Sequence, residues 1–438
     1  MNLVPFPLTA IDRRAAYKVL AIGLAVAFLC LVVDVLCIVK VGPNSPTLGD
    51  GPFYAGLARS LASGRGYVLE RENSFWPGQP TVTRVPLWPV ILSVPARIFP
   101  HANENALLRF TGAILHAISA ALMVALTLQL TGSLAGAALA GGFLGIYPPA
   151  SGLVVGGYSE IAFLPAMLAG VILVLEGPRA RYAGAILCGV AVLARPNFIL
   201  LPLMLLSLLI LFRSGDIAAW RKLRLWAMFG ILFLVAPSVW IVRNYLISGY
   251  FPVLAGMEGE TLYGGNNARV ASDLAYWGYW VMPNEIPGEK PKQELAQTRS
   301  ELEVNHYYHQ KAMEYIRANW FALPRLMVGK LVRGFVPVPW VPFAASYIVF
   351  FSRACVYVAF AVAWSIWRER NEAFTFAVAA MLLVILATTL VYYGSFRFTF
   401  CVEPFLFPFI VGAAVTTMRA RKASLNRGCR SERLVGSY

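Results

Sequence analysis

The feature that most constrains this chain is a series of long apolar stretches, several of which reach membrane length. A helix needs about 20 apolar residues to cross a hydrocarbon layer about 30 Å thick. Only 13% of the 438 residues are charged, whereas soluble domains carry about 25%. Because so little charge cannot cover a globular surface, a soluble enzyme, a disordered protein and a secreted disulfide scaffold are excluded. The apolar stretches cover roughly residues 19–39, 107–130, 133–148, 159–175, 183–195, 197–212, 225–246, 344–366, 373–393 and 400–418.

These ten stretches predict an all-α, multi-pass membrane protein with about ten transmembrane helices. An even number places both ends of the chain on one side, and clusters of Arg and Lys between the stretches mark that side as cytoplasmic. The formal net charge of +15 is then explained by topology and by anionic membrane lipids rather than by nucleic acid. The sequence predicts one transmembrane domain over 1–438, with a basic cytoplasmic tail over 419–438.

Local sequence features refine this topology. Arg195-Pro196-Asn197 interrupts the apolar residues 183–212, so this region is either two short spans or one broken helix. The six cysteines form no CxxC pair, and their spacing suggests neither a zinc site nor a disulfide framework. Glycines four residues apart predict close helix packing in two places: Gly132 with Gly136, and Gly141 with Gly145.

Two long connections, 41–106 and 247–343, are predicted to lie on the outer side of the membrane. In the first, apolar residues recur every four positions after Asp50, which predicts an amphipathic helix lying in the interface plane. Asp50 is a good residue to cap the start of this helix. A second interfacial helix is predicted from Trp88 to about Phe99. Any reaction is expected at this outer face.

Several motifs in and around these connections resemble those of the GT-C glycosyltransferases, which use polyprenyl-phosphate sugars. The resemblance begins with an acid, Asp50, followed by Tyr54-Ala55 and then by an Arg-x-Pro-Leu-x-Pro-like element at 84–89. The most similar group is the aminoarabinose transferase and protein O-mannosyltransferase-like branch. Further elements follow in the same order over about 400 residues: Gly157-Tyr158-Ser159-Glu160, Leu193-Ala194-Arg195-Pro196, Trp240-Ile241-Val242-Arg243-Asn244-Tyr245, Gly264-Gly265-Asn266-Asn267 and Phe396-Arg397-Phe398.

The resemblance implies that a sugar moves, with inversion, from polyprenyl phosphate to a lipid, glycan or protein acceptor at the outer face of a cell membrane. In a bacterium this would be the periplasmic face of the inner membrane. Asp50 would be the general base that takes a proton from the acceptor. A guanidinium group can donate two parallel hydrogen bonds to the oxygens of one phosphate. The candidates for binding the departing phosphate are therefore Arg84, Arg243, Arg397 and Arg195.

Other candidate site residues follow from the same motifs. Glu160, as a second acid, and Tyr54 would lie near the acceptor, and Asn266 and Asn267 would contact sugar hydroxyls. The aminoarabinose transferases carry an acid and a lysine just before the proline that matches Pro86, but this chain has Arg84 and Val85 there. No metal ligand is therefore assigned, although a divalent metal stays open as a cofactor beside the lipid-linked donor.

Two other classes of function stay open at this stage. A transporter or flippase of a lipid-linked sugar would show helices broken at matching places in two halves, and only the break near Arg195 is visible. A sugar polymerase or ligase would carry a long outer loop late in the chain. The connection 247–343 partly meets that expectation, but the early Asp50 loop argues against it.

Overall fold

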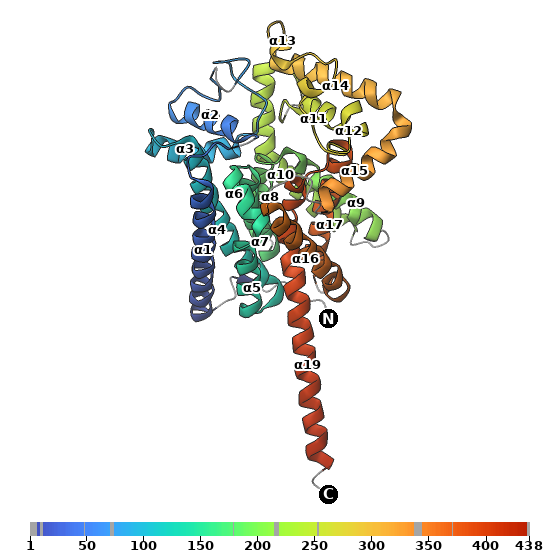
Figure 1. Cartoon of the computed structure of the whole chain (residues 1–438). Helices are drawn as coiled ribbons and strands as arrows, with labels where there is room; N and C mark the ends of the chain where they lie inside the picture. The colour runs from blue at the N-terminus through green and yellow to red at the C-terminus, as the bar shows by residue number, and fades with distance from the viewer. Residues whose placement is uncertain are drawn as a thin grey trace.

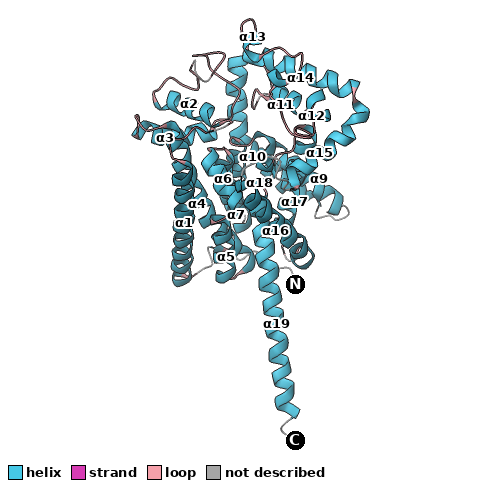
Figure 2. Ribbon diagram, viewed as in Figure 1, coloured by secondary structure: helices cyan, strands magenta, loops and turns pink. Residues whose placement is uncertain are grey.

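The chain folds into helices joined by loops, as a computed structural model of it makes visible (Figures 1 and 2). Within the described residues there is no strand, only an isolated bridge between Val68 and Pro80. The predicted all-α fold class is therefore confirmed. The structure describes residues 7–8, 12–47, 49–70, 74–177, 179–213, 219–251, 254–336, 344–369 and 371–435.

Five helices in the described part of the chain are long and apolar enough to cross a membrane. A sixth span results when α5 (Leu134–Gly145) and α6 (Pro148–Gly156), which are bent by 43° to each other, are counted together. The five single helices are α1 (Arg13–Val41), α4 (Glu104–Thr131), α10 (Ala219–Ser248), α16 (Ala344–Trp367) and α17 (Glu372–Val391).

The other predicted stretches also form helices, but shorter or differently bounded ones. The region around Arg195 forms two separate helices, because Pro196 lacks an N–H and forces Arg195 into an extended conformation (φ −137°, ψ 91°). The helix before this break packs on α7 and α10, and the helix after it packs mainly on α17. These helices are α7 (Glu160–Glu176), α8 (Ala180–Val192), the 3-10 helix η2 (Pro196–Leu200), α9 (Leu201–Arg213) and α19 (Phe407–Val435).

Both long connections lie at the same end of the bundle, opposite the end from which α19 extends (Figure 1). The two helices predicted in the first connection are confirmed as α2 (Gly51–Ala62) and α3 (Leu87–Ile98). The described part of the second connection contains five α-helices: α11 (Glu258–Gly265), α12 (Ala268–Ser272), α13 (Lys292–Ala296), α14 (Glu301–Ala318) and α15 (Leu323–Phe335). It also contains two short 3-10 helices, η3 (Pro283–Glu285) and η4 (Trp320–Ala322).

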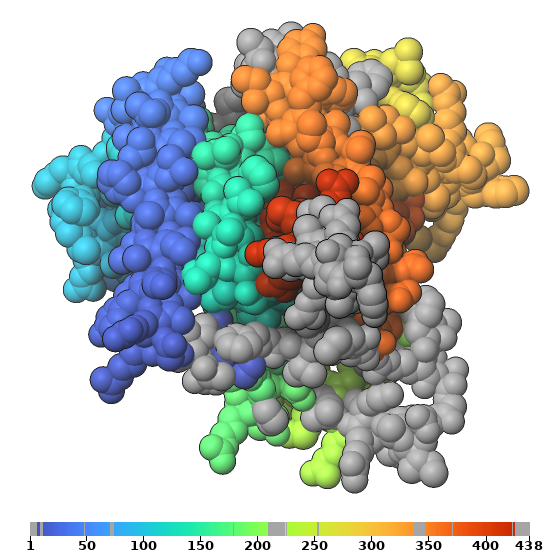
Figure 3. All heavy atoms as spheres, turned by 90° about the horizontal axis from the view of Figure 1, so that it is seen from below, coloured from blue at the N-terminus to red at the C-terminus, as the bar shows by residue number. Residues whose placement is uncertain are grey.

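The helix α4 organises the N-terminal half of the bundle, since it packs against α1, α5, α6 and α7. Viewed from below, α5 (teal) lies beside α1 (blue) (Figure 3). The indole N–H of Trp88 on α3 donates to the carbonyl of Gly157, 3.1 Å away, in the turn between α6 and α7. This bond fixes the first connection to the end of the bundle where the charged residues described next converge.

Candidate functional site

Five charged side chains from distant parts of the sequence meet at the end of the bundle that carries the two connections. All five are buried or half-buried, with side-chain exposures between 0% and 28%. We call them the charged cluster, and they are Asp50, Arg84, Glu160, Arg195 and Arg397.

Each member of the charged cluster sits at the end of an element or in a break between elements. Asp50 directly precedes α2, and Arg84 lies in the loop that leads into α3. Glu160 is the first residue of α7, where the positive end of the helix dipole favours a carboxylate. Arg195 occupies the break before Pro196, and Arg397 lies in the short helix α18 (Phe396–Phe400). The five side chains therefore come from helix ends, a short helix and breaks between helices, and not from the middle of the long helices.

Asp50 occupies the N-cap position of α2, but its side chain makes no capping hydrogen bond. Instead Oδ1 accepts from Arg84 Nη2 at 2.9 Å, and Oδ2 accepts from Arg397 Nη2 at 3.1 Å. Burial opposes ionisation of this carboxyl. The adjacent guanidinium groups outweigh that effect and lower the pKa of Asp50 from 3.8 to about 2. The capping role predicted from its position is therefore wrong, and the carboxylate faces the charged cluster.

Glu160 is fully buried and bridges two arginines. Its Oε1 accepts from Arg195 Nη1 at 3.1 Å and from Arg397 Nε at 2.7 Å. Its Oε2 accepts from Arg397 Nη2 at 3.4 Å. Every carboxylate oxygen of the two acids is thus bound by a guanidinium group, and Arg397 joins the two acids to each other.

The charged cluster holds more cationic than anionic groups: three guanidinium groups against two carboxylates. Two of its N–H groups, Arg84 Nε and Arg195 Nε, are buried without a hydrogen-bond partner. A buried donor without an acceptor costs about 1–3 kcal/mol. The cluster therefore has both the charge and the free donors to accept an anion.

Aromatic rings surround these arginines. The guanidinium carbon of Arg397 lies 4.0 Å from the ring centroid of Tyr158, and that of Arg195 lies 5.3 Å from Phe398. Arg84 lies 5.2 Å from the ring of Phe53. Aromatic faces favour cations and exclude water, which strengthens charge interactions inside the cluster.

Two other predicted residues lie beside or outside the charged cluster. Tyr54 is buried on α2, and its hydroxyl donates to Ser159 Oγ at 3.3 Å, next to Glu160. Arg243 forms no ion pair with Asp50 or Glu160. Its Nη1 donates to the carbonyl of Thr81 at 2.6 Å, and its guanidinium stacks on Trp240 at 4.6 Å. Arg243 is therefore not part of the charged cluster.

Asn266 and Asn267 are buried, and their side chains are used inside the protein. Asn266 donates to the carbonyls of Leu262 and Val391 and accepts from Lys330 Nζ at 2.7 Å. Asn267 caps α12 by accepting from the N–H of Val270. The Nδ2 group of Asn267 donates to the carbonyls of Tyr263 and Gly264. Because both amides bind groups of the protein itself, neither residue is part of the charged cluster.

The sequence did not predict a role for Lys330, which joins the second connection to the end of α17. Its Nζ also donates to the carbonyls of Leu390 and Val391, both at 3.1 Å. This contact lies shortly before Ser395, which caps α18 and so helps to place Arg397. A lysine within an amphipathic stretch gives no sequence signal for such a role.

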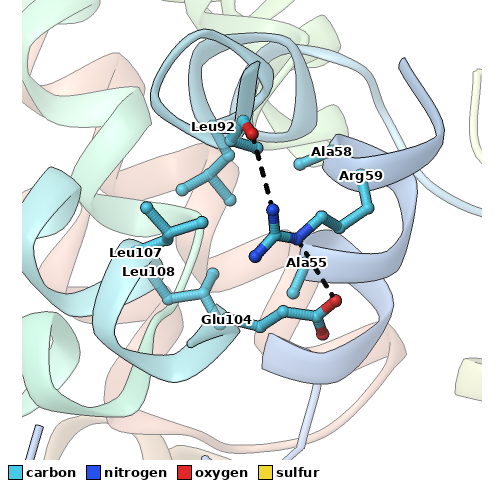
Figure 4. Close-up of a pocket in the computed structure, with 8 residues that line it drawn as sticks. Ala55, Ala58, Arg59, Leu92, Glu104, Leu107 and Leu108 are labelled. Carbon is cyan, nitrogen blue, oxygen red and sulfur yellow. Dashed lines mark hydrogen bonds and ion pairs between the residues drawn. The ribbon is translucent and has the colours of Figure 1, made fainter. Parts of the chain in front are cut away.

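A small pocket lies elsewhere, between α2, α3 and the start of α4 (Figure 4). Arg59 lies across it, with its Nε 3.6 Å from Glu104 Oε1. No member of the charged cluster lines this pocket, and its other lining residues are apolar: Ala55, Ala58, Leu92, Ala96, Leu107 and Leu108. The pocket provides no chemistry for the charged cluster.

No protein-family model and no curated protein matches this chain. Solved structures do. The oligosaccharyltransferase AglB from Archaeoglobus fulgidus, in complex with an inhibitory peptide and a dolichol-phosphate, matches with a TM-score of 0.52 and 13% identity over 96% of this chain. The chain spans about half of that protein, since the match covers 52% of it.

Two structures of ArnT from Cupriavidus metallidurans also match. The form bound to undecaprenyl phosphate gives a TM-score of 0.44 at 14% identity, covering 95% of this chain and 80% of ArnT. The apo form gives 0.42 at 18% identity, covering 92% and 78%. The likeness to the archaeal protein is one of fold, and it agrees with the fold that the motifs predict. The chain thus shares the all-helical membrane fold of that archaeal protein.

Proposed function

We propose that this protein is an integral membrane glycosyltransferase that moves a sugar from a polyprenyl-phosphate donor to a lipid, glycan or protein acceptor. The observation that carries the proposal is the charged cluster, with three guanidinium groups, two carboxylates and two unpartnered N–H donors. AglB and ArnT were solved with dolichol-phosphate and undecaprenyl phosphate, which are anions of the kind that such a cluster would bind.

The donor phosphate would bind to Arg84, Arg195 and Arg397. Two of these arginines, Arg84 and Arg397, each bind one oxygen of Asp50. A phosphate that draws either guanidinium toward itself frees a carboxylate oxygen to accept a proton. Donor binding would therefore prepare Asp50 to act as a base, which requires the lipid donor to bind before the acceptor is activated.

The transfer would then be a single displacement. The acceptor oxygen forms a bond to the anomeric carbon while the bond from that carbon to the phosphate oxygen breaks. The bonding electrons leave with the lipid phosphate, whose new charge the arginines stabilise, and Asp50 takes the proton of the acceptor. One displacement from the opposite face inverts the anomeric configuration.

Glu160 would hold the arginines rather than take part in proton transfer. It is fully buried, and both of its oxygens accept from Arg195 or Arg397. Without this carboxylate, three guanidinium groups would repel one another in a site of low polarity. Glu160 is thus a positioning residue in this proposal.

The charged cluster does not fit a divalent metal ion. Every oxygen of both carboxylates is already paired with a guanidinium group, and the remaining charge of the cluster is positive. A metal ion bound to any oxygen of Asp50 or Glu160 would lie next to a positively charged arginine. The proposed reaction therefore has no step that uses a metal.

The proposal is tested with the full chain reconstituted in vesicles and a panel of labelled polyprenyl-phosphate sugars. We expect the wild type to consume at least one donor, and Arg84→Gln and Arg397→Gln to lose about 10-fold to 1,000-fold in kcat/KM. Arg65→Gln is the matched control, because Arg65 lies in the same connection in an exposed ion pair with Glu70, and such pairs contribute little.

Two results would contradict the proposal. If the wild type consumes no lipid-linked sugar across the panel but moves such a lipid between leaflets, the protein is a flippase. If Arg84→Gln and Arg397→Gln keep the activity of Arg65→Gln, the charged cluster is not the phosphate site.

A further inference from the structure

A second group of polar side chains lies inside the helix bundle and has no role in the proposed reaction. Cys30 and Asp34 come from α1 and His116 from α4, and each is 0% exposed. Cys30 and Asp34 are one helical turn apart and so share a face of α1. Their ligand atoms and that of His116 all lie within 4.8 Å of one another.

The hydrogen bonds of His116 determine which of its ring nitrogens could bind a metal ion. Nε2 lies 3.0 Å from the carbonyl oxygen of Leu144, which can only accept, so Nε2 carries a hydrogen. Nδ1 lies 2.8 Å from Asp34 Oδ2. A histidine that binds a metal through one nitrogen commonly donates its other N–H to a backbone carbonyl. His116 already has this arrangement, with Nδ1 directed at Asp34.

The carboxylate of Asp34 is oriented in the same way. Ser151 on α6 donates its hydroxyl to Oδ1 at 2.7 Å, which leaves Oδ2 facing His116 and Cys30. Cys30 Sγ lies 3.8 Å from Oδ2. Gly145 lets α5 approach α1 here, because a Cβ at that position would lie 3.1 Å from Cys30 Cβ. Four helices thus enclose one sulfur, one nitrogen and one oxygen.

Charge balance favours a divalent cation among these three atoms. A carboxylate buried in a membrane protein is costly unless it is neutralised. A thiolate, a carboxylate and a neutral imidazole together carry a charge of −2, which a divalent cation cancels. Sulfur, imidazole nitrogen and carboxylate oxygen are also the ligands that Zn²⁺ takes in proteins.

We propose that Cys30 Sγ, Asp34 Oδ2 and His116 Nδ1 bind one Zn²⁺ ion. Binding releases the thiol proton of Cys30 and the proton that Asp34 and His116 share. The ion joins α1 to α4, and Ser151 joins α6 to the same site. Since α1 leads to Asp50 and α6 leads through Gly157 to Glu160, the metal would stabilise the helices that deliver both acids of the charged cluster. This proposal does not depend on the proposed transferase activity.

Cobalt, which replaces zinc and absorbs light, tests the site. The full chain is purified in detergent, stripped with a chelator and titrated with Co²⁺. We expect one equivalent to give the near-ultraviolet band of a thiolate–cobalt bond, and Zn²⁺ to remove it. Cys30→Ser should lose the band, whereas Cys37→Ser should keep it, because Cys37 lies on the same helix but outside the three-residue group.

A second readout protects the test against variants that fail to fold. Zn²⁺ should raise the thermal unfolding temperature of the stripped wild type, and Ser151→Ala should weaken Co²⁺ binding about 10-fold to 100-fold. If the stripped wild type shows neither the cobalt band nor a zinc-dependent rise, the group is a metal-free Asp–His pair and the proposal is overturned. A band that survives Cys30→Ser also overturns it.

Discussion

In the proposed reaction Asp50 has two environments, one before and one after the donor phosphate binds. Arg84 and Arg397 each bind one of its oxygens, and these ion pairs make Asp50 a weak base. Bound phosphate would compete for the same guanidinium groups. The ion pairs therefore keep the carboxylate ionised and oriented, and in the proposed reaction they would also delay proton transfer until the donor is bound.

The ion pairs of Asp50 predict an acid-dependent stability. Its pKa is lowered from 3.8 to about 2 in the folded protein, so its stabilising effect is complete above about pH 4 and is lost as the pH falls through about 2. Asp50→Asn cannot titrate. We expect the difference in free energy of unfolding between wild type and Asp50→Asn to narrow between pH 5 and pH 2.5.

Denaturant unfolding in detergent at several pH values measures this difference. A difference that stays constant, or widens on acidification, would contradict the ion pairs of Asp50. The same variant serves the functional proposal, because loss of a general base costs about 100-fold to 10,000-fold in rate. Binding of polyprenyl phosphate should survive in Asp50→Asn, since removing a carboxylate leaves the arginines more positive.

At the scale of elements, small residues decide how closely the helices pack. Three of the four glycines predicted to allow close packing do so: a Cβ would lie 2.8 Å from Val411 at Gly136, 2.5 Å from Val124 at Gly141 and 3.1 Å from Cys30 at Gly145. Gly132 has a different role. It ends α4 in the left-handed region, with φ 60°.

Two adjacent glycines on α5 give a matched test of this packing. A Cβ at Gly141 would lie 2.9 Å from the carbonyl oxygen of Ala120 on α4, besides its contact with Val124, whereas a Cβ at Gly142 meets nothing within 4 Å. We expect Gly141→Ala to destabilise the protein by about 1–3 kcal/mol. Gly142→Ala should leave stability unchanged or raise it by up to about 1 kcal/mol.

Thermal or denaturant unfolding of the two variants under the same conditions measures the comparison. Equal stability of Gly141→Ala and Gly142→Ala would mean that α5 does not approach α4 closely. Because α5 carries Leu144 and Gly145 to the side of Cys30 and His116, this close contact also supports the proposed metal site.

For the whole molecule, the two long connections lie together at one end of the bundle, and the charged cluster lies at that same end (Figure 1). The proposed topology puts that face outside the cell and the exposed basic part of α19 in the cytoplasm. We expect a membrane-impermeant maleimide to label Gln293→Cys, at an exposed position of α13, in intact cells. Arg421→Cys, exposed on α19, should be labelled only after the cells are opened.

The wild type, with its native cysteines, supplies the background for this labelling. Labelling of Arg421→Cys but not of Gln293→Cys in intact cells would reverse the topology and place the charged cluster on the cytoplasmic side. Labelling of both would contradict the placement of the two segments on opposite sides.

The sequence by itself determined the class of protein and the location of its helices, since apolar length and proline breaks act over short distances. The stretches 107–130 and 373–393 became α4 and α17, and the proline after Arg195 separated α8 from α9. Family-like motifs also supplied every member of the charged cluster as a candidate. Local patterns gave no means of choosing among the four arginines, because an interfacial arginine and a phosphate ligand look alike in sequence.

Only the tertiary structure decided which candidates work together. Arg397 binds Glu160, 237 residues away in the sequence, and Asp50, 347 residues away. Arg243 instead donates to the carbonyl of Thr81. The same is true of Cys30 and His116, whose spacing predicted no metal site. Hydrophobic length fixes where a helix forms, but ion pairs and ligand sets depend on how distant helices pack, and side-chain contacts set that packing in three dimensions.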